Sequence, residues 1–94
     1  MRVKWLRIAL QDLTSIHEFI ARDNREAASR SIEQIEAAVE MLTQFPAMGK
    51  PGRVPGTREL VVPHTQYVVP YRVREDRIEI LAVIHAARKW PENF

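Results

Sequence analysis

The chain has 94 residues, of which 46% are hydrophobic and 28% are charged, a balance typical of a globular protein with one modest core. It contains no cysteine, which excludes disulfides, thiolate metal sites and cysteine nucleophiles. The formal net charge is +2, but residues 1–49 carry six Lys or Arg against seven Asp or Glu, whereas residues 50–94 carry eight against five. The basic character therefore lies in the second half, which would matter for an acidic partner or a nucleic acid; from charge alone, scattered arginines on a solvated face are the alternative.

The N-terminus mixes Arg and Lys with apolar residues in "MRVKWLRIAL". It therefore lacks the uninterrupted apolar segment of a signal peptide, and no run approaches the length needed to span a bilayer. We expect a single domain, residues 1–94, located in the cytoplasm and without membrane contact.

The first half of the chain predicts a strand and two helices. Residues 2–6 alternate and include an aromatic residue, which is typical of a strand. From residue 7 to 22, apolar residues recur at steps of four, three and four, the pattern of an amphipathic helix: Ala9, Leu13, Ile16 and Ile20.

A second helix follows after only a few residues. Asp23 or Asn24 can cap its N-terminus, and Glu26 places a carboxylate in its first turn, near the positive end of the helix dipole. Its apolar stripe again steps by four and three, through Ala28, Ile32, Ile35, Val39 and Leu42. The helix should stop before Pro46, because proline disfavours helical geometry in the preceding residue. Two such helices must pack as an antiparallel hairpin.

Residues 47–56, "AMGKPGRVPG", predict a loop because they are rich in Gly and Pro. This loop is not a phosphate-binding loop, since a strand and not a helix follows it. Three strand-like runs come next, at residues 57–62, 67–73 and 77–86, and their short connections favour an antiparallel meander. The order β-α-α-β-β-β predicts an α+β fold in which an antiparallel sheet carries a helical hairpin on one face.

The alternation of the last strand predicts a second, exposed face of the sheet. If Ile78 and Ile80 face the helices, Leu81, Val83 and His85 should face away from them. Arg72 of the preceding strand should join them there. Exposed apolar surface rimmed by positive charge is the usual mark of a binding site.

Few residues in the chain can support chemistry. The three histidines lack metal-site spacing, and no serine lies in a nucleophile elbow. The remaining candidates are Arg58, Arg72, His85 and Arg88. Guanidinium groups can hold phosphates and an imidazole can transfer a proton near neutral pH, so these residues could cleave RNA. They could equally make a non-catalytic contact with an acidic partner, and the residues alone leave both alternatives open.

The succession of "FPAMGKPG", "GTREL", "YRV" and "IHAARKWP" resembles the RelE/ParE superfamily of bacterial toxins. These are the growth-arresting components of type II toxin–antitoxin modules, which stabilise plasmids. The resemblance covers essentially the whole chain and implies the RelE-like fold. It also implies a cognate antitoxin as partner, a protein whose C-terminal segment wraps the toxin, and no cofactor or metal.

Two activities occur on this fold, so the fold alone does not decide the function. RelE-like members cut mRNA on the ribosome, and Arg58 and His85 are similar in position to their catalytic residues. ParE-like members are described as poisons of DNA gyrase. This chain has no match for the Lys pair and C-terminal Tyr of some RNA-cutting members, and its ending resembles the ParE branch more closely. The prediction is therefore gyrase inhibition, with ribosome-dependent mRNA cleavage as the alternative.

The resemblance and the predicted faces together assign the remaining roles. We expect Arg72, Leu81 and Val83 to bind the antitoxin, because they should form an apolar surface flanked by positive charge. We expect the tail residues Arg88, Lys89 and Trp90 to bind the target, because two cations and an aromatic ring follow the last strand. For Trp90, packing against the core is the alternative.

Overall fold

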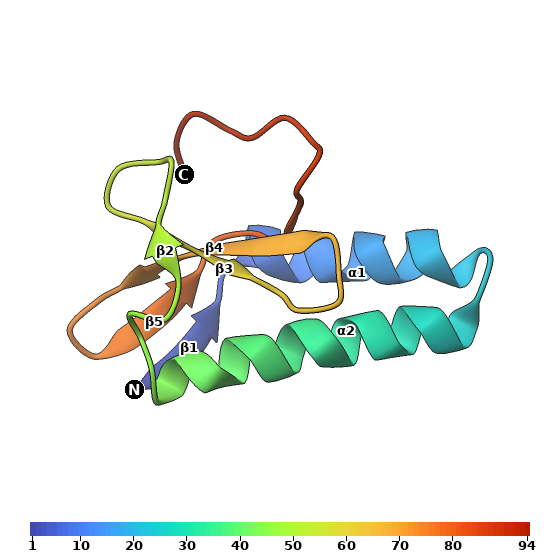
Figure 1. Cartoon of the computed structure of the whole chain (residues 1–94), viewed down its shortest axis with the longest axis horizontal. Helices are drawn as coiled ribbons and strands as arrows, with labels where there is room; N and C mark the ends of the chain where they lie inside the picture. The colour runs from blue at the N-terminus through green and yellow to red at the C-terminus, as the bar shows by residue number, and fades with distance from the viewer.

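The computed structural model describes residues 1–94 and shows two helices packed on one side of a mixed sheet (Figure 1). The predicted α+β class and the helical hairpin are confirmed. No helix is long and apolar enough to cross a membrane. The elements in chain order are β1 (Arg2–Trp5), α1 (Arg7–Ala21), α2 (Arg25–Glu40), a 3₁₀ turn (Met41–Thr43), β2 (Lys50–Pro51), β3 (Arg58–Val61), β4 (Tyr67–Val73), β5 (Arg77–Ile80) and β6 (Ile84–His85).

The two helices bury the stripes that the sequence predicts. Their most deeply buried side chains are Ala9 and Ile16 on α1 and Ala28, Ile35 and Val39 on α2. The side-chain oxygen of Asn24 accepts a hydrogen bond from the backbone N–H of Ala27 at 3.0 Å, which caps α2 and satisfies one of its free N–H groups. These contacts hold the hairpin on the sheet, and they leave three large apolar side chains of α1 exposed: Ile8, Leu10 and Phe19.

The sheet runs in the order β1-β5-β4-β3-β2, and β6 also pairs with β4. Strands β3, β4 and β5 form the predicted antiparallel meander. The first strand differs from the expected arrangement, because β1 lies parallel to β5 at the edge of the sheet. A long connection through both helices separates these two strands, and such a connection permits parallel pairing.

The predicted continuous strand 77–86 is broken by a bulge. Ile80 lies opposite Tyr71 and Ile84 lies opposite Val68, so four steps on one strand match three on the other. The extra residue reverses the alternation of side chains beyond Ile80. The bulge lies beside Pro70, which has no N–H to give to a ladder, and the carbonyl of Pro70 accepts the N–H of Leu81 at 3.0 Å.

This reversal corrects the predicted exposure of three residues. Leu81 is only 3% exposed and Val83 only 5%, and Val83 belongs to the core cluster beneath the helices. His85 lies opposite Tyr67, a residue packed against the same core, so it too faces the helix side. The expectation that Leu81 and Val83 form an exposed apolar face is therefore wrong.

The loop after α2 is attached to the sheet by Tyr71. The hydroxyl of this fully buried residue donates to the carbonyl of Pro46 at 2.7 Å and accepts from the N–H of Gly49 at 2.9 Å. Burial raises its pKa, against the lowering effect of the Gly49 hydrogen bond and the Arg58 charge. A Cβ at position 49 would lie 2.7 Å from the Tyr71 ring, so glycine is required for this close approach.

We predict that Tyr71→Phe destabilises the protein by about 1–3 kcal/mol, because it leaves a buried N–H and a buried carbonyl without a partner. In a domain of this size each kcal/mol lowers the melting temperature by about 4–8 °C. Thermal unfolding followed by circular dichroism measures the effect. Tyr67→Phe is the matched control, since the Tyr67 hydroxyl makes no hydrogen bond within the protein, and a similar loss in both variants would contradict the prediction.

Candidate functional site

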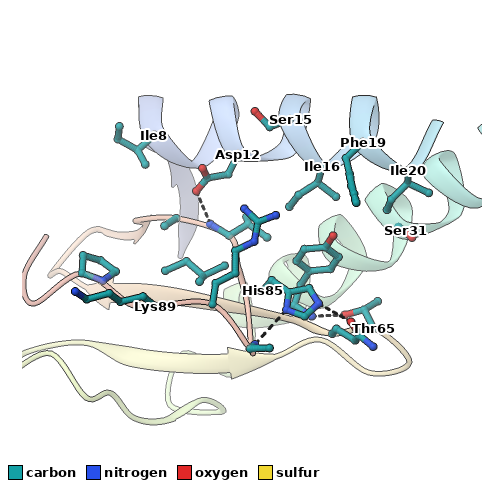
Figure 2. A pocket seen from close by; sticks show the side chains of 18 of the residues that line it. Ile8, Asp12, Ser15, Ile16, Phe19, Ile20, Ser31, Thr65, His85 and Lys89 are labelled. Carbon is teal, nitrogen blue, oxygen red and sulfur yellow. Dashed lines mark hydrogen bonds between the residues drawn. The ribbon is translucent and has the colours of Figure 1, made fainter. Parts of the chain in front are cut away.

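A groove with a volume of about 1020 Å³ runs between α1 and the segment that carries β6 (Figure 2). One wall is α1, where Ile8 and Phe19 are each 56% exposed although both are apolar. The opposite wall is residues 82–85, and residues 64–67 and the C-terminal tail complete the rim. The groove therefore combines exposed apolar side chains with a strand that pairs with β4 on only one of its sides.

Asp12 holds the two walls of this groove together. Its Oδ2 accepts the backbone N–H of Val83 at 2.9 Å (Figure 2). Burial raises the pKa of Asp12, and the hydrogen bond from Val83 opposes this rise without cancelling it. The side chain thus satisfies an N–H in the bulge and fixes α1 beside it.

His85 lines the groove, but both of its ring nitrogens are occupied. Nε2 is hydrogen-bonded to Oε1 of Gln66, and Nδ1 accepts the backbone N–H of Ala87 at 3.1 Å. The ring also makes an edge contact with Tyr67, with centroids 5.6 Å apart. An Nδ1 that accepts a hydrogen bond requires the proton on Nε2. In this arrangement the imidazole orders the chain where β6 leads into the tail.

Arg58 lies far from His85 and is also engaged. Arg58 pairs with Tyr71 in β4, whereas His85 pairs with Tyr67. Tyr67 and Tyr71 are four residues apart, so Arg58 and His85 are separated by about 13 Å along β4. Nη1 of Arg58 donates to the carbonyl of Gly49 at 2.7 Å. The structure therefore does not bring the two predicted catalytic residues together.

The three predicted target-binding residues divide into two groups. Arg88 and Lys89 are exposed, line the groove and form no ion pair. Trp90 is half-buried, and its indole Nε1 is buried without a hydrogen-bond partner. The ring is not part of the helix-packed core cluster. The guanidinium carbon of Arg53 lies instead 3.8 Å from the ring centroid, a cation–π contact.

Arg53 connects the tail to a buried carboxylate on the far face of the sheet. Glu59 accepts the backbone N–H of Arg53 at 2.7 Å and its Nε at 3.2 Å. Burial raises the pKa of Glu59, but the hydrogen bonds and the charge of Arg53 lower it more, so it lies below the ordinary 4.5. Glu59 thus holds Arg53, and Arg53 holds Trp90 in the tail. We call these three residues the clamp.

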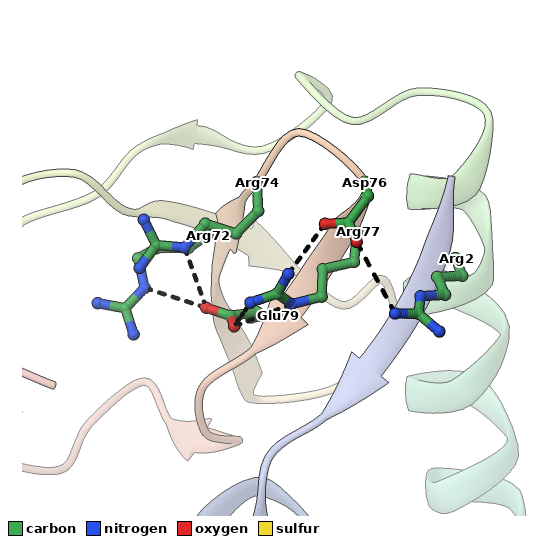
Figure 3. Close-up of polar contacts among 6 residues, drawn as sticks. All are labelled: Arg2, Arg72, Arg74, Asp76, Arg77 and Glu79. Atoms are coloured by element: carbon green, nitrogen blue, oxygen red, sulfur yellow. Dashed lines mark hydrogen bonds and ion pairs between the residues drawn. The ribbon is translucent and has the colours of Figure 1, made fainter.

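Arg72, the third predicted antitoxin-binding residue, is separated from the groove. It lies on the face of the sheet opposite the helices, where its Nε is 3.6 Å from Oε1 of Glu79 (Figure 3). Two further arginines, Arg74 and Arg77, hold the same carboxylate. Burial raises the pKa of Glu79, and the hydrogen bonds from Arg77 and Arg74 lower it below its ordinary value.

Several features of the site escaped the sequence interpretation. Ile8 and Phe19 lie eleven residues apart, which places them on one side of a helix, and their apolar character outside the core stripe was the available signal. The alternation of Arg72, Arg74 and Glu79 around the "REDR" turn was a signal for the cluster on the far face. No group of three or more His, Asp or Glu side chains is placed to hold a metal ion.

Comparison with known proteins identifies relatives along the whole chain. Residues 3–90 match the family described as "ParE toxin of type II toxin-antitoxin system, parDE". The chain is 43% identical over 91 residues to "Putative toxin Y4kP" of Sinorhizobium fredii, covering 97% of this chain and 94% of that protein. It is 32% identical over 87 residues to "Toxin RelE2" of Caulobacter vibrioides, covering 93% and 97%.

A solved structure agrees with these sequence matches. The "Chromosomal ParDE TA system from P. aeruginosa" contains a chain that superimposes with a TM-score of 0.83 at 31% identity. The superposition covers 90% of this chain and 95% of that one. The similarity therefore extends over most of the helices and the sheet.

We predict that the clamp makes stability depend on pH. The pKa of Glu59 is lower in the folded protein than its ordinary 4.5, so its stabilising effect is present above that pH and is lost as the pH falls through the folded value. Glu59→Gln should lower the melting temperature at pH 7 and flatten its dependence between about pH 5 and about pH 3.

The control for this prediction is Glu33→Gln, because Glu33 is exposed on α2 and forms no ion pair. Melting curves of the three proteins across this range measure the effect. A Glu59→Gln variant with the same pH dependence as the parent would contradict the role of the clamp.

Proposed function

This chain belongs to the ParE toxin family of type II toxin–antitoxin systems, and we propose that it arrests growth by inhibiting DNA gyrase in the cytoplasm and is neutralised by a cognate antitoxin. The family places the chain in a toxin–antitoxin module, in which a toxin is paired with an antitoxin. Gyrase as the target is what the similarity to the ParE branch implies.

Gyrase is preferred to mRNA as the target because Arg58 and His85 lie far apart. Acid–base cleavage of RNA requires a proton acceptor and a cation within reach of one phosphodiester. Here about 13 Å of β4 lies between them, and the hydrogen bonds of each side chain serve the fold. Neither residue is held ready for a substrate, which favours a target that is bound and not cut.

The groove between α1 and β6 supports the proposed antitoxin contact. Exposed apolar side chains that gather beside a strand are typical of a surface that receives a segment folding on binding. The rim carries Arg88 and Lys89, which suit acidic residues in the incoming segment. In this proposal the antitoxin occupies the groove, and not the far-face region around Arg72.

We predict that induction of this chain without antitoxin stops cell division while protein synthesis, measured by labelled methionine in the first minutes, continues near its initial rate. Purified gyrase should lose supercoiling activity in its presence. His85→Gln should be as toxic as the parent, because the amide can still hydrogen-bond but cannot act as an acid or base. An immediate collapse of synthesis that His85→Gln abolishes would establish the mRNA-cleaving alternative.

We predict that Phe19→Glu weakens binding of the antitoxin encoded beside this chain by about tenfold to a hundredfold, because it removes an aromatic anchor from the groove. Leu10→Glu is the matched control. Leu10 is also exposed and apolar but lies on the opposite side of α1, since it is two positions from Ile8 and nine from Phe19. Isothermal calorimetry measures both affinities, and equal affinities would place the antitoxin elsewhere.

A further inference from the structure

The face of the sheet opposite the helices carries a cluster of cations that neither the groove nor the clamp uses. Parallel pairing sets Lys4 opposite Glu79 and Arg2 opposite Arg77, and antiparallel pairing sets Arg72 opposite Glu79 on the other side. Paired residues point to the same face of a sheet. We call the five cations on this face the basic patch: Arg2, Lys4, Arg72, Arg74 and Arg77. Figure 3 shows the four arginines.

The carboxylates within the basic patch do not balance its charge. Glu79 is held by Arg77 at 3.0 Å and Arg74 at 3.3 Å, and Asp76 is held by Arg77 at 2.9 Å and Arg2 at 3.8 Å. Lys4 forms no ion pair. Five cations against these two carboxylates and Glu75, which lies between Arg74 and Asp76 in the turn, leave an excess of two positive charges, which favours a polyanionic partner.

The guanidinium groups of the basic patch are held in place, but some of their N–H donors have no hydrogen-bond partner. Glu79 lies at the centre and fixes the orientation of three arginines (Figure 3), and each guanidinium has five N–H donors. Nε of Arg72 is buried 3.6 Å from Oε1 of Glu79, and the two terminal nitrogens of Arg72 make no hydrogen bond within the protein. A phosphate oxygen would satisfy such donors, and arginine binds phosphate with good geometric complementarity.

The neighbouring residues distinguish between possible polyanions. Single-stranded nucleic acids are bound by stacking bases on aromatic rings. Trp5 and Tyr71 both pair with Ile80 and so point to the helix side, and the ring of Trp90, at the other end of this face, is already in contact with the guanidinium group of Arg53. An acidic peptide that folds on binding needs apolar anchors, and the patch side chains are all polar. What remains is a backbone of regularly spaced phosphates, which cations alone can hold.

We propose that the basic patch binds the phosphate backbone of duplex DNA. Successive residues on one face of a strand are about 6.6 Å apart and neighbouring strands about 4.8 Å, a spacing that lets adjacent cations meet adjacent phosphates. The contact goes beyond the proposed inhibition of gyrase, because it needs only this chain and DNA. In the cell it would join the toxin to the duplex on which gyrase acts.

The test compares two triple variants by fluorescence anisotropy with a labelled 20-base-pair duplex. Arg2→Ala/Lys4→Ala/Arg74→Ala removes three exposed cations of the patch and leaves Arg72 and Arg77 on Glu79. The matched control removes the same charge from the exposed surface of the helical hairpin: Arg22→Ala/Arg25→Ala/Arg30→Ala. Melting curves establish that both are folded, and Lys4→Gln/Arg74→Gln is a milder second patch variant.

We expect the patch variant to bind the duplex at least about tenfold more weakly than the control at 0.1 M salt. The slope of log affinity against log salt should also fall by about 2.7, because each lost phosphate contact contributes about 0.9. A parent that does not bind the duplex, or a control that weakens as much as the patch variant, would overturn the proposal.

Two further probes separate the sources of negative charge. A single-stranded RNA of equal length or a polyglutamate peptide that binds through the patch more tightly than the duplex would overturn the choice of DNA. Because no gyrase is present in these measurements, their outcome does not depend on whether gyrase is the target. Failure of the supercoiling assay would overturn the gyrase proposal and leave DNA binding intact.

Discussion

One extra residue between Ile80 and Ile84 determines the shape of this protein around its groove. The bulge turns Val83 into the core and places His85 on the helix side, where a regular strand would have sent both to the opposite face. It also leaves the N–H of Val83 outside the ladder, and Asp12 accepts it. The contact between α1 and β6, and therefore the groove, depends on this local departure from strand geometry.

The two faces of the sheet consequently have different chemistry. On the helix side, the groove has apolar walls and suits a partner that buries surface on binding. On the far side, one end is covered by the clamp of Glu59, Arg53 and Trp90, and the other end carries the basic patch. Because these surfaces do not share side chains, an antitoxin in the groove and a polyanion on the far face would not compete for the same residues.

The same fold serves both branches of the toxin superfamily, so the roles of individual side chains have to be argued from the contacts that they make. In this chain Arg58 donates to the loop after α2, beside the hydroxyl of Tyr71 that binds the same loop. His85 uses both ring nitrogens to order the start of the tail. In the proposed function these residues, which are similar in position to catalytic groups, belong to the framework, and family resemblance alone does not assign their roles.

The sequence by itself determined the class of the fold, because helical and strand periodicities are local and the apolar stripes of α1 and α2 leave only one way to pack. It also limited the cap of α2 to Asp23 or Asn24 and indicated the family. Only the tertiary structure decided which face Leu81, Val83 and His85 occupy, since a single bulge inverts every side chain beyond it and one extra residue leaves no mark in a run of strand-forming residues. The parallel pairing of β1 with β5 and the contact of Arg53 with Trp90 also join segments remote in sequence. Such pairings follow from packing, which no local pattern encodes.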